Sequence, residues 1–144
     1  MIKDEVKNQL SGKIRNWEVK NSKRIYFEID KEDIKEISRK FYKDFGMRLS
    51  TITGIDNENN FELIYHFGLD KTGEIFNIRT FIMEKNNPEI DSLIDLFKAS
   101  DWVEREIHEL LGIKFKGHPN LKHLLLDDDW PKNSYPLRKD YKNE

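Results

Sequence analysis

The sequence predicts a single α+β domain, with helices packed on one face of a mixed or antiparallel sheet and an extended arm at the C-terminus. Runs of consecutive strand-like segments are typical of this fold class, and here alternating or β-branched apolar residues mark strands at 24–29, 47–55, 61–69 and 74–83. Segments with apolar residues at helical spacing lie between and after these strands. From residue 112 onward the chain shows little helical or strand periodicity.

The first half of the chain predicts a short helix or frayed end, two strands, a helix and a third strand. These elements are expected at 1–12, 13–20, 24–29, 32–45 and 47–55. The segment RIYFEI, which ends at Ile29, is rich in β-branched and aromatic residues and is the stronger of the first two strands. Asp30 is a candidate cap for the following helix, and Gly46 stands where that helix should end.

The second half begins with the clearest strand, because apolar residues occupy every second position from Phe61 to Leu69. Residues 70–73 (DKTG) predict a hairpin to the strand at 74–83. A helix is then expected to open at 86–88 (NNP) and to turn four apolar residues inward: Ile90, Leu93, Ile94 and Phe97.

A second helix is expected at 102–111, with Asp101 as its cap and Glu104 at the capping-box position. Gly112 provides its end. We therefore divide the chain into a core at 1–111 and an arm at 112–144. Long segments without secondary structure are more often functional or partner-bound than free loops, so the arm is expected to pack on another subunit. Of the tryptophans in this region, Trp102 is expected in the core and Trp130 in an interface.

The composition excludes several classes of function. The chain has no cysteine, which rules out disulfides, thiolate zinc sites and iron–sulfur clusters bound by this chain. Its 25 basic and 27 acidic residues give no field that would favour nucleic acid. No apolar run reaches the roughly 20 residues that span a bilayer, and the N-terminus lacks the apolar core of a signal peptide. A cytoplasmic protein without direct membrane insertion is expected.

Few residues suggest catalysis. Glu104 and His108 lie four residues apart on one predicted helix and, with His118, could serve a metal- or acid/base-dependent hydrolase. The zinc-protease helix is absent, because Gly112 stands where its second histidine would be. In isolation, Glu104, Arg105 and Glu106 are most simply a charged helix face, and adjacent helical residues do not face each other.

One stretch carries a specific resemblance. The run W-x-E-R-E…G-I-x-F-x-G-H-P-x-L…P-L-R-K-D resembles the signature of the 30 kDa subunit of respiratory complex I (the C subunit of NADH-quinone oxidoreductase) and of the homologous small subunit of membrane-bound, energy-converting [NiFe] hydrogenases. It is carried by Trp102, Glu104, Arg105, Glu106, Gly112, Ile113, Phe115, Gly117, His118, Pro119, Leu121 and Pro136 to Asp140. The longer link between Trp130 and Pro136 favours the hydrogenase type.

The resemblance implies a non-catalytic structural subunit on the cytoplasmic side of the cell membrane, within a peripheral arm. It would pack against a large subunit homologous to the [NiFe]-hydrogenase large subunit and near iron–sulfur subunits. Those partners would carry iron–sulfur clusters and in one case a [NiFe] centre, while this chain would bind no cofactor. The resemblance places the following residues in the interface: Glu104, Arg105, Glu106, Gly117, His118, Pro119, Trp130, Pro136, Leu137, Arg138, Lys139 and Asp140. A hydrolase and a stand-alone protein-binding module are the alternatives.

Overall fold

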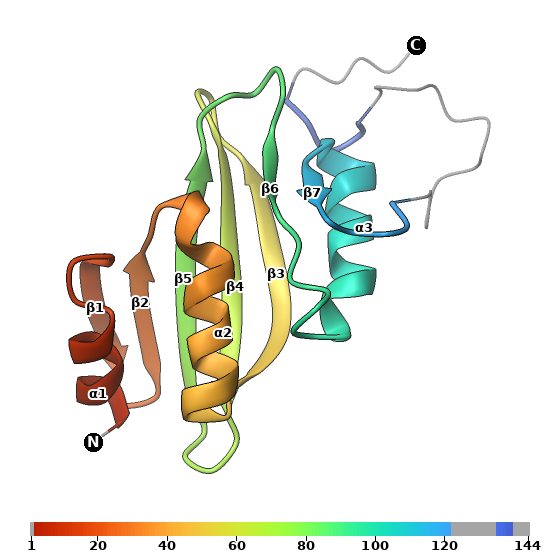
Figure 1. The fold of residues 1–144 in the computed structure, drawn as a ribbon. Coiled ribbons are helices and arrows are strands. Elements are labelled where there is room, and N and C mark those ends of the chain that lie inside the picture. The colour runs from red at the N-terminus through yellow and green to blue at the C-terminus, as the bar shows by residue number, and fades with distance from the viewer. Residues whose placement is uncertain (1, 122–134, 140–144) are drawn as a thin grey trace.

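The structure, a computed structural model, describes residues 2–121 and 135–139. Its centre is a five-stranded sheet in the order β1-β2-β5-β4-β3 (Figure 1). The strands are β1 (Arg15–Asn21), β2 (Arg24–Glu28), β3 (Arg48–Asp56), β4 (Phe61–Leu69) and β5 (Glu74–Ile82). β2 and β5 run parallel, whereas the other neighbours are antiparallel. The predicted mixed sheet is confirmed.

The strand register gathers the apolar side chains on one face. Tyr65 of β4 lies opposite Ile52 of β3 and Ile78 of β5, and Phe67 lies opposite Phe76. Because side chains alternate along a strand, these pairings bury every second residue of β4 and β5. In β3 a register shift between Leu49 and Thr51 interrupts the alternation. The buried set on this face includes Ile25, Phe27, Ile52, Phe61, Leu63, Tyr65, Phe67, Phe76, Ile78 and Ile82.

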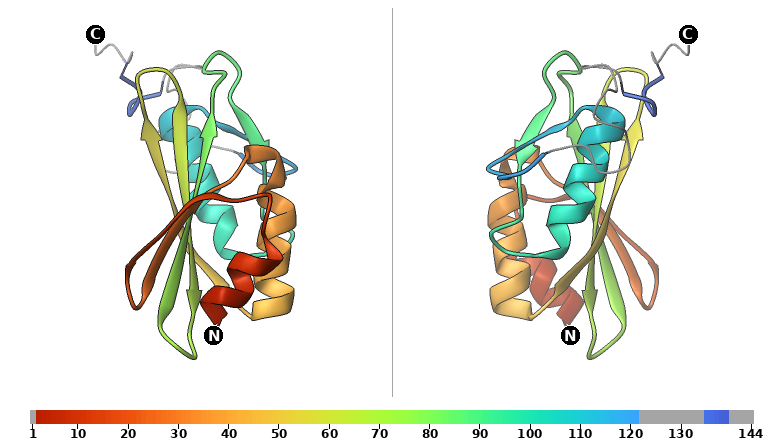
Figure 2. Two further views of the ribbon diagram at one scale, coloured as in Figure 1. Left: turned by 90° about the vertical axis from the view of Figure 1, so that its left-hand side faces the viewer. Right: turned by 90° about the vertical axis from the view of Figure 1, so that its right-hand side faces the viewer.

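The helices α1 (Ile2–Gln9), α2 (Ile34–Phe45) and α3 (Ala99–Leu111) cover this apolar face (Figure 2). A short 3₁₀ turn, η1 (Lys31–Asp33), precedes α2. The ring of Phe41 on α2 lies 5.1 Å from that of Phe67 and 6.2 Å from that of Phe27, measured between centroids. α2 ends at Gly46 in the left-handed conformation, as expected. The prediction of helices on one face is confirmed.

α3 packs on the outermost strand, β3, through Ile107 and Leu111. This contact depends on Gly54, because a Cβ atom at that position would lie 2.9 Å from Cδ1 of Leu111. The small residue in β3 therefore allows the helix to approach the strand closely.

The helix predicted from residue 86 is wrong. Residues 89–91 form a strand, β6 (Glu89–Asp91), which pairs in parallel with β7 (Lys114–Lys116). Only one helical turn follows, where the amides of Leu96 and Phe97 donate to the carbonyl of Leu93. The apolar spacing from 90 to 97 was helical, yet Ile90 is buried because it lies opposite Phe115, a contact between segments far apart in the sequence.

Two expectations about α3 are also wrong. The helix begins at Ala99, with Lys98 as its N-cap residue, so Asp101 lies within the first turn and does not cap it. Trp102 is 57% exposed and does not lie in the core. Because successive helical residues are about 100° apart, Trp102 points roughly opposite to Glu104, which is 0% exposed on the inner side.

The first residues of the predicted arm pack with the core, since Ile113 and Phe115 are 0% and 1% exposed. Residues 135–139 also lie against the core, where the amide of Leu137 donates to the carbonyl of Leu110. Trp130 and Asp140 lie outside the described residues. Within the described ranges, no helix is long and apolar enough to cross a membrane.

Candidate partner-binding surface

The turn at residues 135–139 is bound to the C-terminal end of α3. The amide of Leu137 donates to the carbonyl of Leu110 over 3.0 Å, and Nε of Arg138 donates to the carbonyl of Leu111 over 2.6 Å. The last carbonyls of a helix have no partner within the helix, and a cation there also interacts favourably with the helix dipole. The Pro-Leu-Arg-Lys segment of the signature therefore serves first to end α3 of its own chain.

Two aromatic rings hold the guanidinium of Arg138. Its Cζ lies 5.0 Å from the ring centroid of Phe61 and 4.7 Å from that of Tyr135. The ring of Tyr135 in turn covers Gly112, where a Cβ atom would lie 2.5 Å from Cε2 of the ring. Gly112 also has a φ of 81°, which favours glycine. Gly112 thus allows both the positive φ at the end of α3 and the close approach of the Tyr135 ring.

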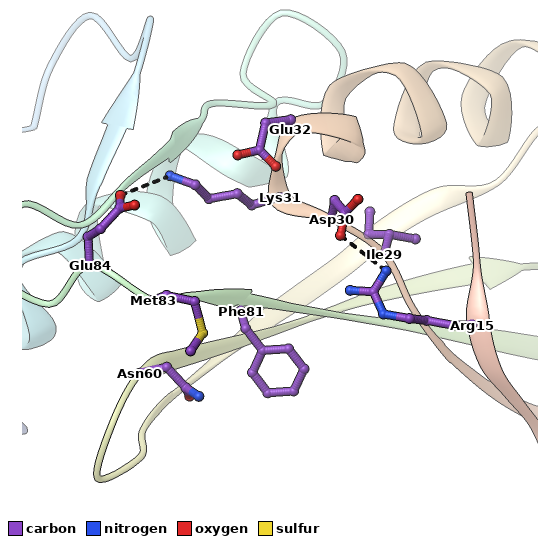
Figure 3. Close-up of a pocket in the computed structure, with 9 residues that line it drawn as sticks. All are labelled: Arg15, Ile29, Asp30, Lys31, Glu32, Asn60, Phe81, Met83 and Glu84. Carbon is purple, nitrogen blue, oxygen red and sulfur yellow. Dashed lines mark ion pairs between the residues drawn. The ribbon is translucent and has the colours of Figure 1, made fainter. Parts of the chain in front are cut away.

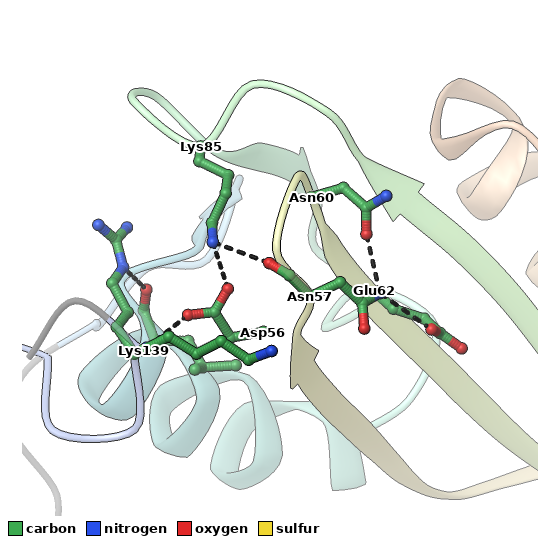
Figure 4. A network of polar contacts seen from close by, with 8 residues as sticks. Asp56, Asn57, Asn60, Glu62, Lys85 and Lys139 are labelled. Carbon is green, nitrogen blue, oxygen red and sulfur yellow. Dashed lines mark hydrogen bonds and ion pairs between the residues drawn. The ribbon is translucent and has the colours of Figure 1, made fainter.

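A buried carboxylate joins the turn to the end of β3 (Figure 4). The amide of Lys139 donates to Oδ2 of Asp56 over 2.7 Å, and Nζ of Lys85 pairs with Oδ1 of Asp56 and donates to the carbonyl of Asn57 over 2.9 Å. Burial would raise the pKa of Asp56, but the hydrogen bonds and charges of Lys85 and Lys139 outweigh it and lower that pKa. Asp56 therefore remains an anion that fixes the turn.

Glu104 fixes the other end of α3 from inside the protein. Its Oε1 accepts a hydrogen bond of 2.5 Å from Oγ of Ser92. Its Oε2 accepts one of 2.8 Å from the amide of Leu93 and a further one from Oγ of Ser100. Burial raises the pKa of Glu104, opposed by these hydrogen bonds and by His118. Its carboxylate thus contacts groups of its own chain and does not reach the surface.

The two predicted histidines also form contacts within the chain. Nδ1 of His108 lies 2.9 Å from the carbonyl of Ile113. Nδ1 of His118 accepts from the amide of Asn120 over 3.0 Å, while its Nε2 lies 3.0 Å from Oδ1 of Asp101. The contact with the amide of Asn120 requires Nδ1 to be unprotonated, so Nε2 carries the proton. His118 therefore ties the segment after β7 to the start of α3.

This arrangement keeps the Glu104 carboxylate away from the surface. Glu104 is 0% exposed, and no substrate can reach its carboxylate without opening the core. Within 2–121 and 135–139, no three or more histidine, aspartate or glutamate side chains are grouped as a metal site would need. Gly117 and Pro119 are exposed, and Arg105 and Glu106 are half-buried on α3.

The outer side of α3 instead carries one exposed apolar residue, Trp102, and one half-buried apolar residue, Leu110. Trp102, Glu106 and Leu110 recur at i, i+4 and i+8 and so lie in one stripe along the helix. Leu137 lies at the Leu110 end of that stripe, and its side chain is 60% exposed although its backbone is fixed. We call Trp102, Glu106, Leu110 and Leu137 the α3 face. It extends over about 12 Å between Trp102 and Leu110.

Three residues that organise this region were not predicted from the sequence, namely Asp56, Phe61 and Lys85. Each of these residues fits the sequence pattern of its own strand or loop, so nothing in the neighbouring sequence indicates its contact with residues 135–139. Asp56 ends the segment Ile52-Thr53-Gly54-Ile55-Asp56. Its place at the end of a strand is the one feature of the sequence that could have pointed to this contact.

Comparison with known proteins places this arrangement in a family. A family model described as "Respiratory-chain NADH dehydrogenase, 30 Kd subunit" matches residues 27–144. The C subunit of NADH-quinone oxidoreductase from Citrifermentans bemidjiense is 34% identical over 117 residues, which cover 78% of this chain and 71% of that protein. The C/D subunit of the same enzyme from Phocaeicola vulgatus is 35% identical over 111 residues, which cover 76% of this chain and 20% of that larger protein.

Two solved structures share the fold. One chain of the membrane-bound sulfane sulfur reductase (MBS), an archaeal respiratory membrane complex, superimposes with a TM-score of 0.84 at 21% identity, over 98% of this chain and 84% of that one. A trypsin-resistant fragment of Nqo5 (1–134) gives a TM-score of 0.66 at 22% identity, over 83% of this chain and 96% of that one. The chain belongs to the family of the respiratory-chain NADH dehydrogenase 30 kDa subunit.

Proposed function

We propose that the chain is a non-catalytic structural subunit of a membrane-associated electron-transfer complex, held on the cytoplasmic side of the membrane by its partners. Its α3 face packs against a large subunit homologous to the [NiFe]-hydrogenase large subunit, and iron–sulfur subunits lie nearby. The complex is of the NADH-quinone oxidoreductase or the energy-converting hydrogenase type. Family membership supports the complex, and the α3 face supports the mode of contact.

The observation that carries the proposal is the exposure of Trp102 and Leu137, at 57% and 60%, along one side of α3. Tryptophan is among the residues that contribute most to protein–protein binding when an interface buries them. Half-buried Arg105 and Glu106 lie on the same helix and can form the polar rim of such an interface.

The segment that presents Leu137 is held by hydrogen bonds within its own chain. Hydrogen bonds to Leu110, Leu111 and Asp56 fix the backbone that presents Leu137. A surface that is already ordered loses less conformational entropy on binding. Burial of Leu137 by a partner would therefore lose little backbone entropy, as expected for a permanent structural contact.

The name of one relative supports a stable contact with a second subunit. The Phocaeicola relative is named as a C/D subunit, and this chain matches 20% of it, so the matched part shares one polypeptide with a much larger unmatched part. Such a fusion supports a stable association of the matched part with a second subunit.

The experiment is a tagged pull-down of the full chain from gently solubilised membranes, with the subunits identified by mass and the metals measured. Co-purification of a large subunit with iron and nickel would identify the hydrogenase type. Iron with flavin and without nickel would identify the NADH-quinone type. Recovery of the chain alone, without metal, would refute the proposal.

Substitutions test the contact surface in the same experiment. Trp102→Ala removes an exposed side chain and should leave the stability of the isolated chain within about 0.5 kcal/mol of wild type. It should weaken assembly by about 2 kcal/mol, which is roughly 30-fold in affinity. Val19→Ala, at a 47% exposed position on β1, is the matched control and should assemble normally. Equal recovery of both variants would count against the α3 face.

A further inference from the structure

A cavity of about 400 Å³ opens beside the start of α2, between the end of β5 and η1 (Figure 3). Ile29, Phe81 and Met83 supply its apolar lining. Met83 is 62% exposed, the most exposed large apolar side chain among the described residues. An ion pair of 3.1 Å joins Arg15 to Asp30 at this cavity, so these two charges are already matched.

A second hollow of about 120 Å³ lies beside the first. The two share Lys31 and Glu32 in their linings, and the second adds Glu89, Ile90, Asp91 and Lys116 from β6 and β7. Nζ of Lys31 donates to the carbonyl of Glu89 over 3.0 Å, so this side chain crosses from η1 to β6. The two hollows therefore adjoin at Lys31 and Glu32, and we call the pair the η1 groove.

The η1 groove has an excess of negative charge. Arg15, Lys31 and Lys116 face five carboxylates, at Asp30, Glu32, Glu84, Glu89 and Asp91, so the lining carries a net charge of −2 (3 positive, 5 negative). Glu32 and Asp91 form no ion pair with any described residue, whereas the other three carboxylates do. Both unmatched carboxylates line the smaller hollow.

We propose that the η1 groove binds an extended segment of a second protein subunit, with an apolar side chain in the larger hollow and a lysine or arginine beside Glu32 and Asp91 in the smaller one. The lining of the first hollow matches an apolar side chain, and the unmatched carboxylates of the second match a cation. Side chains two residues apart in an extended chain point the same way, about 7 Å apart. A strand-like segment presents side chains at this spacing to two adjoining hollows.

This contact differs from the α3 face. The groove lies at the ends of β2 and β5, which are inner strands, whereas α3 packs on β3, an edge strand of the sheet. The inference rests on the proposed function, because it assumes a complex with more than one partner. It adds a second docking surface and the chemistry of the segment that occupies it.

The test is site-specific photo-crosslinking in the intact complex. A benzoylphenylalanine replaces Met83 of the tagged full chain, the complex is purified from solubilised membranes and irradiated, and the product is mapped by mass spectrometry. We expect a product with one segment of another subunit that has a lysine or arginine within three residues of the attachment point. Glu32→Lys should lower its yield about tenfold.

Asp44→Lys is the matched control and should leave the yield unchanged, because Asp44 is exposed near the far end of α2 and forms no ion pair within the described part of the chain. Reversal of the mapped basic residue to glutamate should restore the yield in Glu32→Lys. The η1 groove proposal is overturned if Met83 crosslinks only to lipid or a small molecule, or to a protein segment without a basic residue. It is also overturned if Glu32→Lys and Asp44→Lys lower the yield equally, or if the charge reversal does not restore the yield. Recovery of the complex without any product at Met83 overturns the groove alone, while recovery of the chain alone overturns the proposed function as well.

Discussion

Glu104 is the side chain whose loss should disturb this fold most directly. Its carboxylate accepts hydrogen bonds from the amide of Leu93 and from the hydroxyls of Ser92 and Ser100, and the side chain is 0% exposed. It therefore joins the first turn of α3 to the segment that follows β6. Glu104→Ala removes the acceptor and leaves these three buried donors in place.

The magnitude follows from these contacts. A buried amide left without an acceptor costs about 1–3 kcal/mol, and each lost hydroxyl bond adds about 0.5–1 kcal/mol. Removal of a buried charge returns part of this cost. We expect Glu104→Ala to lower the free energy of unfolding by about 3 kcal/mol, which corresponds to a fall in Tm of about 9 °C for a domain of this size.

The assay is urea unfolding of the purified chain followed by circular dichroism. Glu106→Ala, two residues along the same helix and half-buried, is the matched control and should change stability by less than about 0.5 kcal/mol. A loss below about 1 kcal/mol in Glu104→Ala, or an equal loss in Glu106→Ala, would refute the argument that Glu104 supports the fold from inside.

Glu104→Gln keeps the shape and an acceptor oxygen, and it isolates the effect of charge. The folded pKa of Glu104 is raised by burial, so between the ordinary carboxyl value of 4.5 and that raised value the folded chain binds more protons than the unfolded chain. The Glu104 contribution to stability therefore increases as pH falls through the raised pKa. Wild type should gain stability relative to Glu104→Gln in this range, and identical pH profiles would contradict the raised pKa.

Two further predictions concern the turn at 135–139. The pKa of Asp56 is lowered in the folded chain, so its contribution to stability is present above the ordinary value of 3.8 and is lost as pH falls through the folded pKa. Asp56→Asn should lower the free energy of unfolding by about 1–2 kcal/mol at pH 7 and should flatten the loss of stability below pH 4. Urea unfolding at several pH values measures both effects, and an unchanged acid profile would contradict this prediction. Gly112→Ala must adopt a φ of 81° and displace the ring of Tyr135, whereas Gly46→Ala meets only the backbone cost at a φ of 67°. We expect losses of about 2–3 and about 1 kcal/mol respectively, and equal losses would show that Tyr135 does not cover Gly112 in solution.

The fold was predictable wherever a segment's own pattern decided its structure. Alternation from Phe61 to Leu69 predicted β4, and Gly46 and Gly112 marked the ends of α2 and α3. The prediction failed for residues 86–97, because their apolar spacing is compatible with a helix as well as with a short strand and one turn. Pairing with β7 decides between these two structures, and that partner lies more than twenty residues away.

The candidate site was predictable as a stretch of sequence but not as a set of contacts. The signature residues Arg138 and Lys139 were expected to face a partner, and that role stays a prediction for them. In the structure, the side chain of Arg138 binds the end of α3, and the amide of Lys139 binds Asp56. Nothing near residue 138 indicates that α3 of the same chain supplies the acceptor.

The sequence by itself determined the fold class, the family resemblance and the position of most strands and helices, because periodicity and end signals act over a few residues. Only the tertiary structure decided which charged residues are buried and which apolar ones are exposed. Glu104 and Trp102 lie two residues apart on one helix, yet the first is inside and the second outside. Burial depends on how the helix is rotated against β3, and the contact of Leu111 with Gly54 and the hydrogen bonds of Glu104 both hold this rotation.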